Sequence, residues 1–138
     1  MNPDNSKPTN FFKFENLRIY YKAIDFADAI LVLATNYQGN NQATNYFFTK
    51  FIDEAFCIAA SITDGSAGSK TQFVNELQNT KKAIRNCLIY NTIALKRELI
   101  DETQGADIRN ELMELTKMVG ALIVSLQKQD STTEGSDW

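Results

Sequence analysis

The chemistry open to this chain is limited first by a missing residue type, because none of its 138 residues is a histidine. Without histidine the chain cannot form a Ser-His-Asp or Cys-His catalytic arrangement, a histidine-ligated zinc site, or the Glu-x-x-His di-iron motif of helical bundles. Three other patterns remain to be weighed: a glycine-rich segment over residues 65–71, pairs of acidic residues, and a stripe of basic residues.

The segment Gly65-Ser66-Ala67-Gly68-Ser69-Lys70-Thr71 has the composition of a phosphate-binding loop but not its spacing. Such a loop needs a glycine directly before the lysine and a β-strand before the loop. Here Ser69 precedes Lys70, and the residues before the segment have helical periodicity. We therefore expect a turn between two helices at this position.

Three pairs of acidic residues have a spacing that allows joint action in a helical bundle: Asp25 with Asp28, Asp53 with Glu54, and Glu111 with Glu114. A metal site without histidine would need several of these carboxylates to face inward together. Most of them lie opposite the apolar stripes of their helices, so we expect solvated faces. The sequence thus predicts no catalytic, metal-binding or cofactor-binding residue.

The basic residues are unevenly distributed in a chain whose net charge is −3. Four of them fall on one arc of a predicted helix at about 100° per residue: Lys81, Lys82, Arg85 and Lys96. Such a stripe can neutralise the phosphates of RNA or DNA, although an ordinary solvated face has the same pattern. No aromatic residue is interleaved with it for base stacking, which argues against sequence-specific recognition.

The two cysteines, Cys57 and Cys87, lie in apolar surroundings and are predicted to be buried free thiols. If they lie on antiparallel helices joined near residue 67, they are about 10 Å and 27 Å from the turn, too far apart along the axis for a disulfide. Free thiols suit a reducing compartment. The polar N-terminal residues lack a signal-peptide apolar region, and the apolar run Ala29–Ala34 is too short to span a bilayer. We therefore expect a cytoplasmic protein with no membrane partner.

Helical periodicity organises the chain between a flexible N-terminal arm (residues 1–12) and a disordered tail (residues 129–138). Helices are predicted over residues 15–37, 43–64, 70–100 and 107–128. Short loops between long helices make neighbouring helices antiparallel. The predicted fold class is all-α, an antiparallel up-down-up-down four-helix bundle over residues 13–128.

Residues with known preferences for helix ends set the expected boundaries. Gly65 has the place of a glycine that follows a helix, and Ser69 with Gln72 forms a capping-box pattern for the next helix. Gly105 interrupts the periodicity, so Asp107 is the expected N-cap of the last helix.

Apolar residues outside the bundle-facing stripes indicate a partner surface. The segment 43–64 is apolar on more than one side, and the helix over 70–100 carries isoleucines off its main stripe. We expect the following residues to contribute to an interface between copies of the chain: Phe47, Phe51, Ile89 and Ile93.

Four segments resemble motifs of one protein family, in the same order along the chain. They are Phe14-x-x-Leu17-x-Ile19-Tyr20-x-Lys22-Ala23, the run Ala55–Gly65 (AFCIAASITDG), the run Phe73–Leu77, and the run Lys117–Leu126 (KMVGALIVSL). Through these segments, which fall within residues 12–128, the chain resembles the bacterial four-helix bundle family of 23S rRNA intervening-sequence proteins. The accessory proteins of diversity-generating retroelements are related to that family.

The resemblance implies an antiparallel four-helix bundle that assembles as a ring, usually a homopentamer, without catalytic activity or cofactor. It also implies a link to RNA or to a nucleic-acid enzyme such as a reverse transcriptase, through basic outer surfaces. Where typical members carry two arginines before the central motif, this chain has Ile52 and Asp53. We therefore expect a self-assembling scaffold or adaptor. The alternatives are an RNA- or DNA-binding accessory protein that uses the basic stripe and, more distantly, an enzyme.

Overall fold

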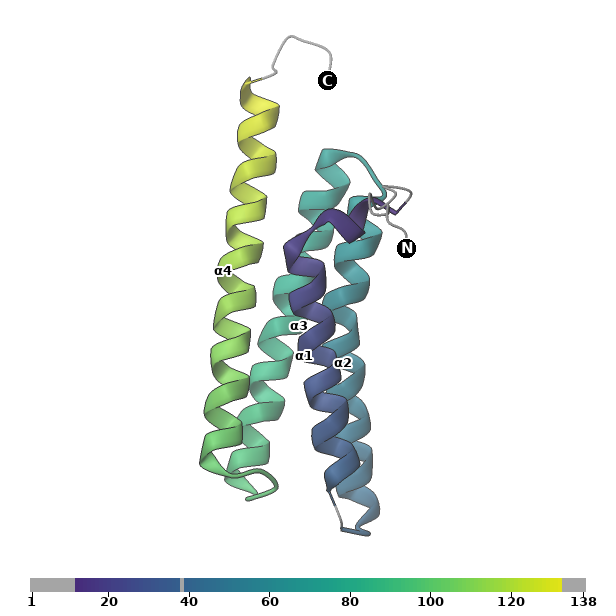
Figure 1. The fold of residues 1–138 in the computed structure, drawn as a ribbon, viewed down its shortest axis with the longest axis vertical. Coiled ribbons are helices and arrows are strands. Elements are labelled where there is room, and N and C mark those ends of the chain that lie inside the picture. The colour runs from purple at the N-terminus through teal and green to yellow at the C-terminus, as the bar shows by residue number, and fades with distance from the viewer. Residues whose placement is uncertain (1–11, 38, 133–138) are drawn as a thin grey trace, which may run out of the picture.

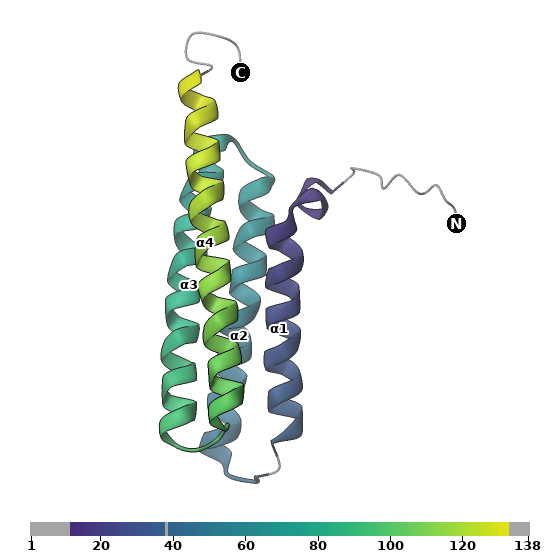
Figure 2. The same cartoon turned by 60° about the vertical axis from the view of Figure 1, so that its left-hand side comes forward.

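The computed structural model describes residues 12–37 and 39–132, which form the predicted all-α four-helix bundle (Figure 1). A short 3-10 helix η1 (Lys13–Asn16) precedes α1 (Arg18–Asn36), α2 (Gln42–Ser66), α3 (Lys70–Lys96) and α4 (Glu102–Thr132). The described ranges contain no strand. Consecutive helices pack along their lengths, whereas α1 and α4 touch less extensively. Figure 1 shows α4 on the left and α1 and α2 on the right, with α3 between them, and Figure 2 shows α4 in front of α2.

A single apolar core runs through the bundle because each helix turns one hydrophobic face inward. The side chains with almost no exposure include two phenylalanines, Phe26 and Phe51. Ser61 and Thr80 are also buried, and their hydroxyl oxygens lie 2.6 Å apart across α2 and α3. Each large apolar side chain that is fully buried in the core contributes about 1.5–3 kcal/mol to the stability of the fold.

The connection between α2 and α3 confirms the predicted turn and capping box. The backbone N–H of Gln72 donates to Ser69 Oγ at 3.2 Å, and Gln72 Oε1 accepts from the N–H of Ser69 at 2.7 Å. The prediction that Gly65 follows the helix is wrong, because α2 continues to Ser66. Gly65 is buried inside α2, where an added Cβ would lie 2.7 Å from Phe73, so glycine allows the two helices to approach closely.

The start of α4 corrects the second prediction about helix ends. Asp101, not Asp107, caps the helix: its carboxylate accepts from the N–H of Gln104 at 2.8 Å, and Gln104 Oε1 accepts from the N–H of Asp101. Gly105 therefore lies within the first turns of α4, buried against Leu95 of α3. The carbonyl of Gly105 also accepts a hydrogen bond from Asn91 at 3.0 Å.

The C-terminal end of α3 comes earlier than predicted, at Lys96 instead of residue 100. Glu98 follows with a φ of 59°, the left-handed conformation that often ends helices. The N–H of Leu99 donates to the carbonyl of Ala94, and that of Glu98 to the carbonyl of Leu95, which is the Schellman pattern. A residue other than glycine rarely holds this conformation, so the sequence did not reveal it.

Most of the predicted flexible arm and tail lies outside the described residues, at 1–11 and 133–138. Within the described residues, α4 extends to Thr132, four residues beyond its predicted end. None of the helices in 12–37 and 39–132 has both the length and the apolar character that crossing a membrane requires.

Candidate interaction surfaces

Two of the four residues of the predicted basic stripe, Lys82 and Arg85, border different surface depressions. Lys82, Arg85 and Lys96 are exposed on α3, and Lys81 is half-buried. Lys82 borders a cleft between α2 and α3, whereas Arg85 borders a groove between α3 and α4. The neighbours of each base therefore determine what it can bind.

The cleft beside Lys82, here called the polar cleft, has a volume of about 370 Å³. Glu54 and Asp64 of α2 line it, so two carboxylates offset the positive charge of Lys82. Asn86 of α3 closes one end by donating to Glu54 Oε1 at 3.2 Å. The negative charge of these two carboxylates opposes the binding of a phosphate group in this cleft.

The groove between α3 and α4, here called the basic groove, has an apolar floor and three basic residues at its edges. Its volume is about 260 Å³. It is lined by Ile84, Arg85, Leu88, Arg109, Leu112, Met113, Thr116 and Lys117. No acidic residue of the described chain lines it, and Met113 leaves 46% of its surface exposed. The basic groove thus combines an apolar contact surface with concentrated positive charge.

Sequence analysis found Arg85 but missed the two other bases of the basic groove, Arg109 and Lys117. The spacing of Arg109, Met113 and Lys117, each four residues apart, places them on one face of a helix. That pattern could have identified the α4 side of the groove. Whether Arg109 and Lys117 lie close to Arg85 depends on how α3 and α4 pack together. The periodicity of a single helix does not predict that packing.

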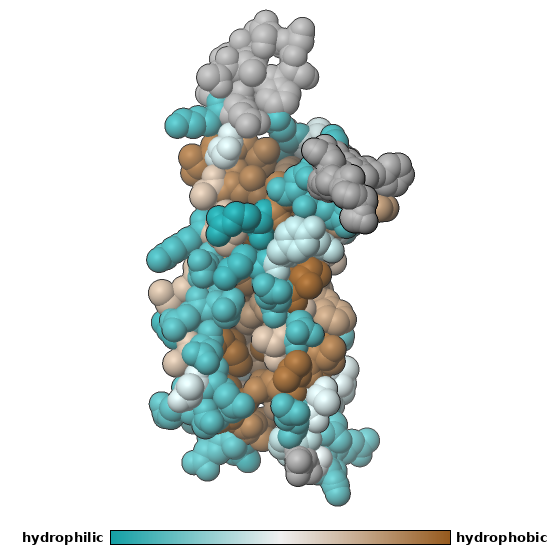
Figure 3. Space-filling model, in the orientation of Figure 1, coloured by the Kyte–Doolittle hydropathy of each residue, from teal (hydrophilic) through white to brown (hydrophobic). Residues whose placement is uncertain are grey.

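A second apolar depression, here called the acidic groove, lies between α1 and α2. Its volume is about 450 Å³, and its lining residues are Ile24, Ala27, Asp28, Leu31, Phe56 and Ala59. Asp28 is the one charged residue that lines it in the described part of the chain. Phe56 is 50% exposed there. Hydrophobic surface is visible among polar residues on the side of α1 and α2 (Figure 3).

The four predicted interface residues occupy three different environments. Phe51 is 0% exposed, so its assignment to an outer interface is wrong: it packs inside the bundle, stacked on Tyr90 at 5.4 Å between ring centroids. Phe47 is half-buried beside Tyr90 and lines another cleft together with Ile93. Ile89 and Ile93 are 57% and 40% exposed, which leaves both available for contact with another molecule.

The structure confirms that both cysteines are free but corrects their predicted burial and separation. Cys87 is buried, whereas Cys57 is exposed. The contact between Asn86 and Glu54 and that between Thr80 and Ser61 place the midpoint of the α2–α3 hairpin near residue 70, not 67. The two thiols therefore lie within roughly one helical turn, about 5 Å, of the same level.

The environment of each thiol favours its protonated form. Desolvation by burial, followed by the negative charge of Glu54 and the neighbouring Cys57, raises the pKa of Cys87. Partial burial, followed by the charges of Glu54 and Asp53, raises the pKa of Cys57 above its ordinary value. Because the thiolate is the reactive form, neither cysteine is activated as a nucleophile.

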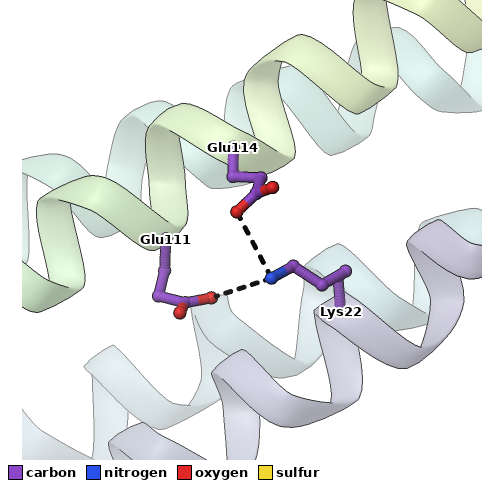
Figure 4. Close-up of polar contacts among 3 residues, drawn as sticks. All are labelled: Lys22, Glu111 and Glu114. Carbon is purple, nitrogen blue, oxygen red and sulfur yellow. Dashed lines mark ion pairs between the residues drawn. The ribbon is translucent and has the colours of Figure 1, made fainter.

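The acidic pairs are mostly exposed to solvent, and one pair forms ion pairs between two helices. Glu111 and Glu114 of α4 both approach Lys22 Nζ of α1, at 3.8 Å and 3.3 Å (Figure 4). Partly exposed ion pairs of this kind contribute about 0–1 kcal/mol each. Across the described ranges, no three acidic or cysteine side chains converge in an arrangement that would hold a metal ion.

Comparisons with known proteins leave the chain without an assigned family. No protein-family model matches it, and the search of curated proteins found no match.

Proposed function

We propose that this protein is a non-enzymatic, self-assembling four-helix bundle of the 23S rRNA intervening-sequence type, which acts as a cytoplasmic scaffold or adaptor. The observation that carries the proposal is the grouping of exposed large apolar side chains in grooves between helices. Ile24, Leu31 and Phe56 share the acidic groove, and Met113 lies in the basic groove. Grouped apolar surface of this kind is typical of protein–protein contact, whereas isolated exposed apolar residues need no partner.

The polar cleft supports a non-enzymatic role. It brings together a thiol, two carboxylates and an amine, those of Cys57, Glu54, Asp64 and Lys82. An enzyme that used Cys57 would need surroundings that lower the pKa of its thiol, but here burial and the nearby acids raise it.

The mass of the purified full chain, measured by light scattering after size-exclusion chromatography, tests self-assembly. One copy has a mass of 15.6 kDa, so the five copies implied by the family resemblance would weigh about 78 kDa. We expect a discrete multiple of the monomer mass at micromolar concentration. A strict monomer throughout the micromolar range would refute the proposal.

A second candidate function is binding of RNA or DNA as a retroelement- or rRNA-associated accessory protein. The observation that favours it is the convergence of Arg85, Arg109 and Lys117 on the basic groove, where none of the three forms an ion pair with another described residue. Three phosphate contacts predict a modest salt dependence for single-stranded RNA, with a slope of log K against log salt of about −2.

Titration of a long fluorescent RNA at low and moderate salt tests this second candidate. The variant Arg109→Ala should weaken binding and reduce the salt slope, whereas Lys82→Ala in the polar cleft should have little effect. Absence of any binding at low salt would end this candidate without affecting the scaffold.

A further inference from the structure

We propose that copies of this chain associate head to tail, with the basic groove of one copy facing the acidic groove of the next. The inference rests on the proposed self-assembly and specifies which surfaces meet. Both grooves have apolar floors, but the charges at their edges are opposite. Arg85, Arg109 and Lys117 border the first, and Asp28 lies in the second.

The charge around the acidic groove extends beyond Asp28. Asp25 precedes Asp28 by three residues on α1, and Asp53 precedes Phe56 by three residues on α2, so each is an exposed neighbour of a lining residue on its own helix. No basic residue of the described chain lines this groove. The acidic groove, with Asp28 in its lining and these acids nearby on the same helices, is thus complementary in charge to the basic groove, and such complementarity selects partners and fixes their orientation.

Exposed apolar side chains supply the contact area between the charges. Phe56 is half exposed at the acidic groove, and Met113 is exposed to a similar degree at the basic groove. A flexible methionine side chain adapts to the surface it meets and makes favourable sulfur–aromatic contacts. Ile89 lies one helical turn beyond Arg85 on α3, which places it at the edge of the same contact.

The position of the two grooves determines what kind of assembly can form. The acidic groove lies between α1 and α2 and the basic groove between α3 and α4. These two pairs of helices lie on different sides of the bundle (Figure 1). Contact between two different surfaces is heterologous, and it repeats from copy to copy until a ring closes or a filament grows. A second copy is the favoured occupant of the basic groove because this chain itself carries a surface of the complementary charge and apolarity.

Charge reversal on each side of the contact tests the pairing. The variants Arg109→Glu and Asp28→Lys each place like charges across the interface, so each should raise the concentration at which the assembly dissociates by tenfold or more. The double variant Arg109→Glu with Asp28→Lys reverses both sides in one chain and should restore assembly. Lys82→Glu, in the polar cleft, makes the same charge change as Arg109→Glu but outside both grooves, and serves as the matched control for that variant.

Sedimentation velocity over a range of concentrations, together with far-ultraviolet circular dichroism to confirm helical content, supplies the readout. If wild type assembles and the single reversals behave like Lys82→Glu, the pairing is overturned while self-assembly stands. If the single reversals weaken assembly and the double variant does not recover, the two grooves do not face each other and the pairing is again overturned. A monomeric wild type refutes the proposed self-assembly itself.

Discussion

Phe51 and Ile89 offer a direct test of the distinction between core and outer surface, because sequence analysis assigned both to an interface. Phe51 is fully buried and stacks on Tyr90 with an interplanar angle of 18°. Its replacement by alanine should lower the free energy of unfolding by about 3–5 kcal/mol. Of this loss, about 0.5–1.5 kcal/mol corresponds to the aromatic pair and the rest to lost apolar burial and the remaining cavity.

Urea denaturation followed by circular dichroism measures this loss. A domain of this size unfolds with a slope of about 2 kcal/mol per molar urea, so a loss of about 4 kcal/mol lowers the midpoint by about 2 M. Because burial within one chain causes the effect, the loss for Phe51→Ala should be the same at every protein concentration.

Ile89→Ala is the matched control, since it removes an apolar side chain from an exposed position of the bundle. At concentrations where the chain is monomeric, it should change the free energy of unfolding by no more than about 0.5 kcal/mol. Where copies associate, the loss should grow with concentration, because association stabilises the folded state by mass action. A loss below about 1.5 kcal/mol for Phe51→Ala, or equal losses for the two variants in dilute solution, would refute the assignment of these residues.

Four further predictions concern individual backbone and thiol positions. Glu98→Gly should raise the free energy of unfolding by about 1 kcal/mol in urea denaturation, because glycine adopts a φ of 59° without strain; a decrease would contradict the helix-end geometry. Gly105→Ala should lower thermal stability, since its methyl group would overlap α3, whereas Gly120→Ala, with nothing within 4 Å of the added atom, should gain up to about 1 kcal/mol from helix propensity. A thiol reagent should modify Cys57 in the native protein and Cys87 only on unfolding. Because the pKa of Cys87 is raised above 9.0 on folding, the stability it confers is complete below pH 9 and decreases at higher pH, by up to about 1.4 kcal/mol per pH unit. Cys87→Ala should flatten this decrease in urea denaturation at pH 8–10, and an unchanged slope would contradict the shift.

The fold was predictable from sequence because helix formation depends on local periodicity and on capping residues that lie close together in the sequence. Ser69 and Gln72 illustrate the reliable case, since both partners of the capping box lie within one turn. The start of α4 had an equivalent signal in Asp101 and Gln104, but Gly105 was given more weight as a helix breaker. In the structure the helix tolerates Gly105 because its missing side chain makes room for Leu95. Packing between helices outweighs the unfavourable propensity of one residue.

The interface residues were harder to assign because α2 is apolar in several directions. Periodicity shows that such a helix has more hydrophobic surface than one stripe needs, but it does not show which residues face the core. Phe51 is buried and packs against Tyr90 of α3. Phe56, which was not among the predicted interface residues, remains exposed beside α1. The orientation of α2 about its axis therefore had to come from the structure.

The placement of the bases changes what the net charge of −3 implies about partners. A negative total argues against a general attraction to nucleic acid, yet it conceals a bundle with positive charge at the α3–α4 groove and negative charge at the α1–α2 groove. Interactions between exposed charges decay over about 8–10 Å at physiological salt, so a partner responds to the local groove and not to the total. Glu54 and Asp64 offset the charge of Lys82, whereas Arg109 and Lys117 of α4 add to that of Arg85, so the positive charge is concentrated where a second helix contributes bases.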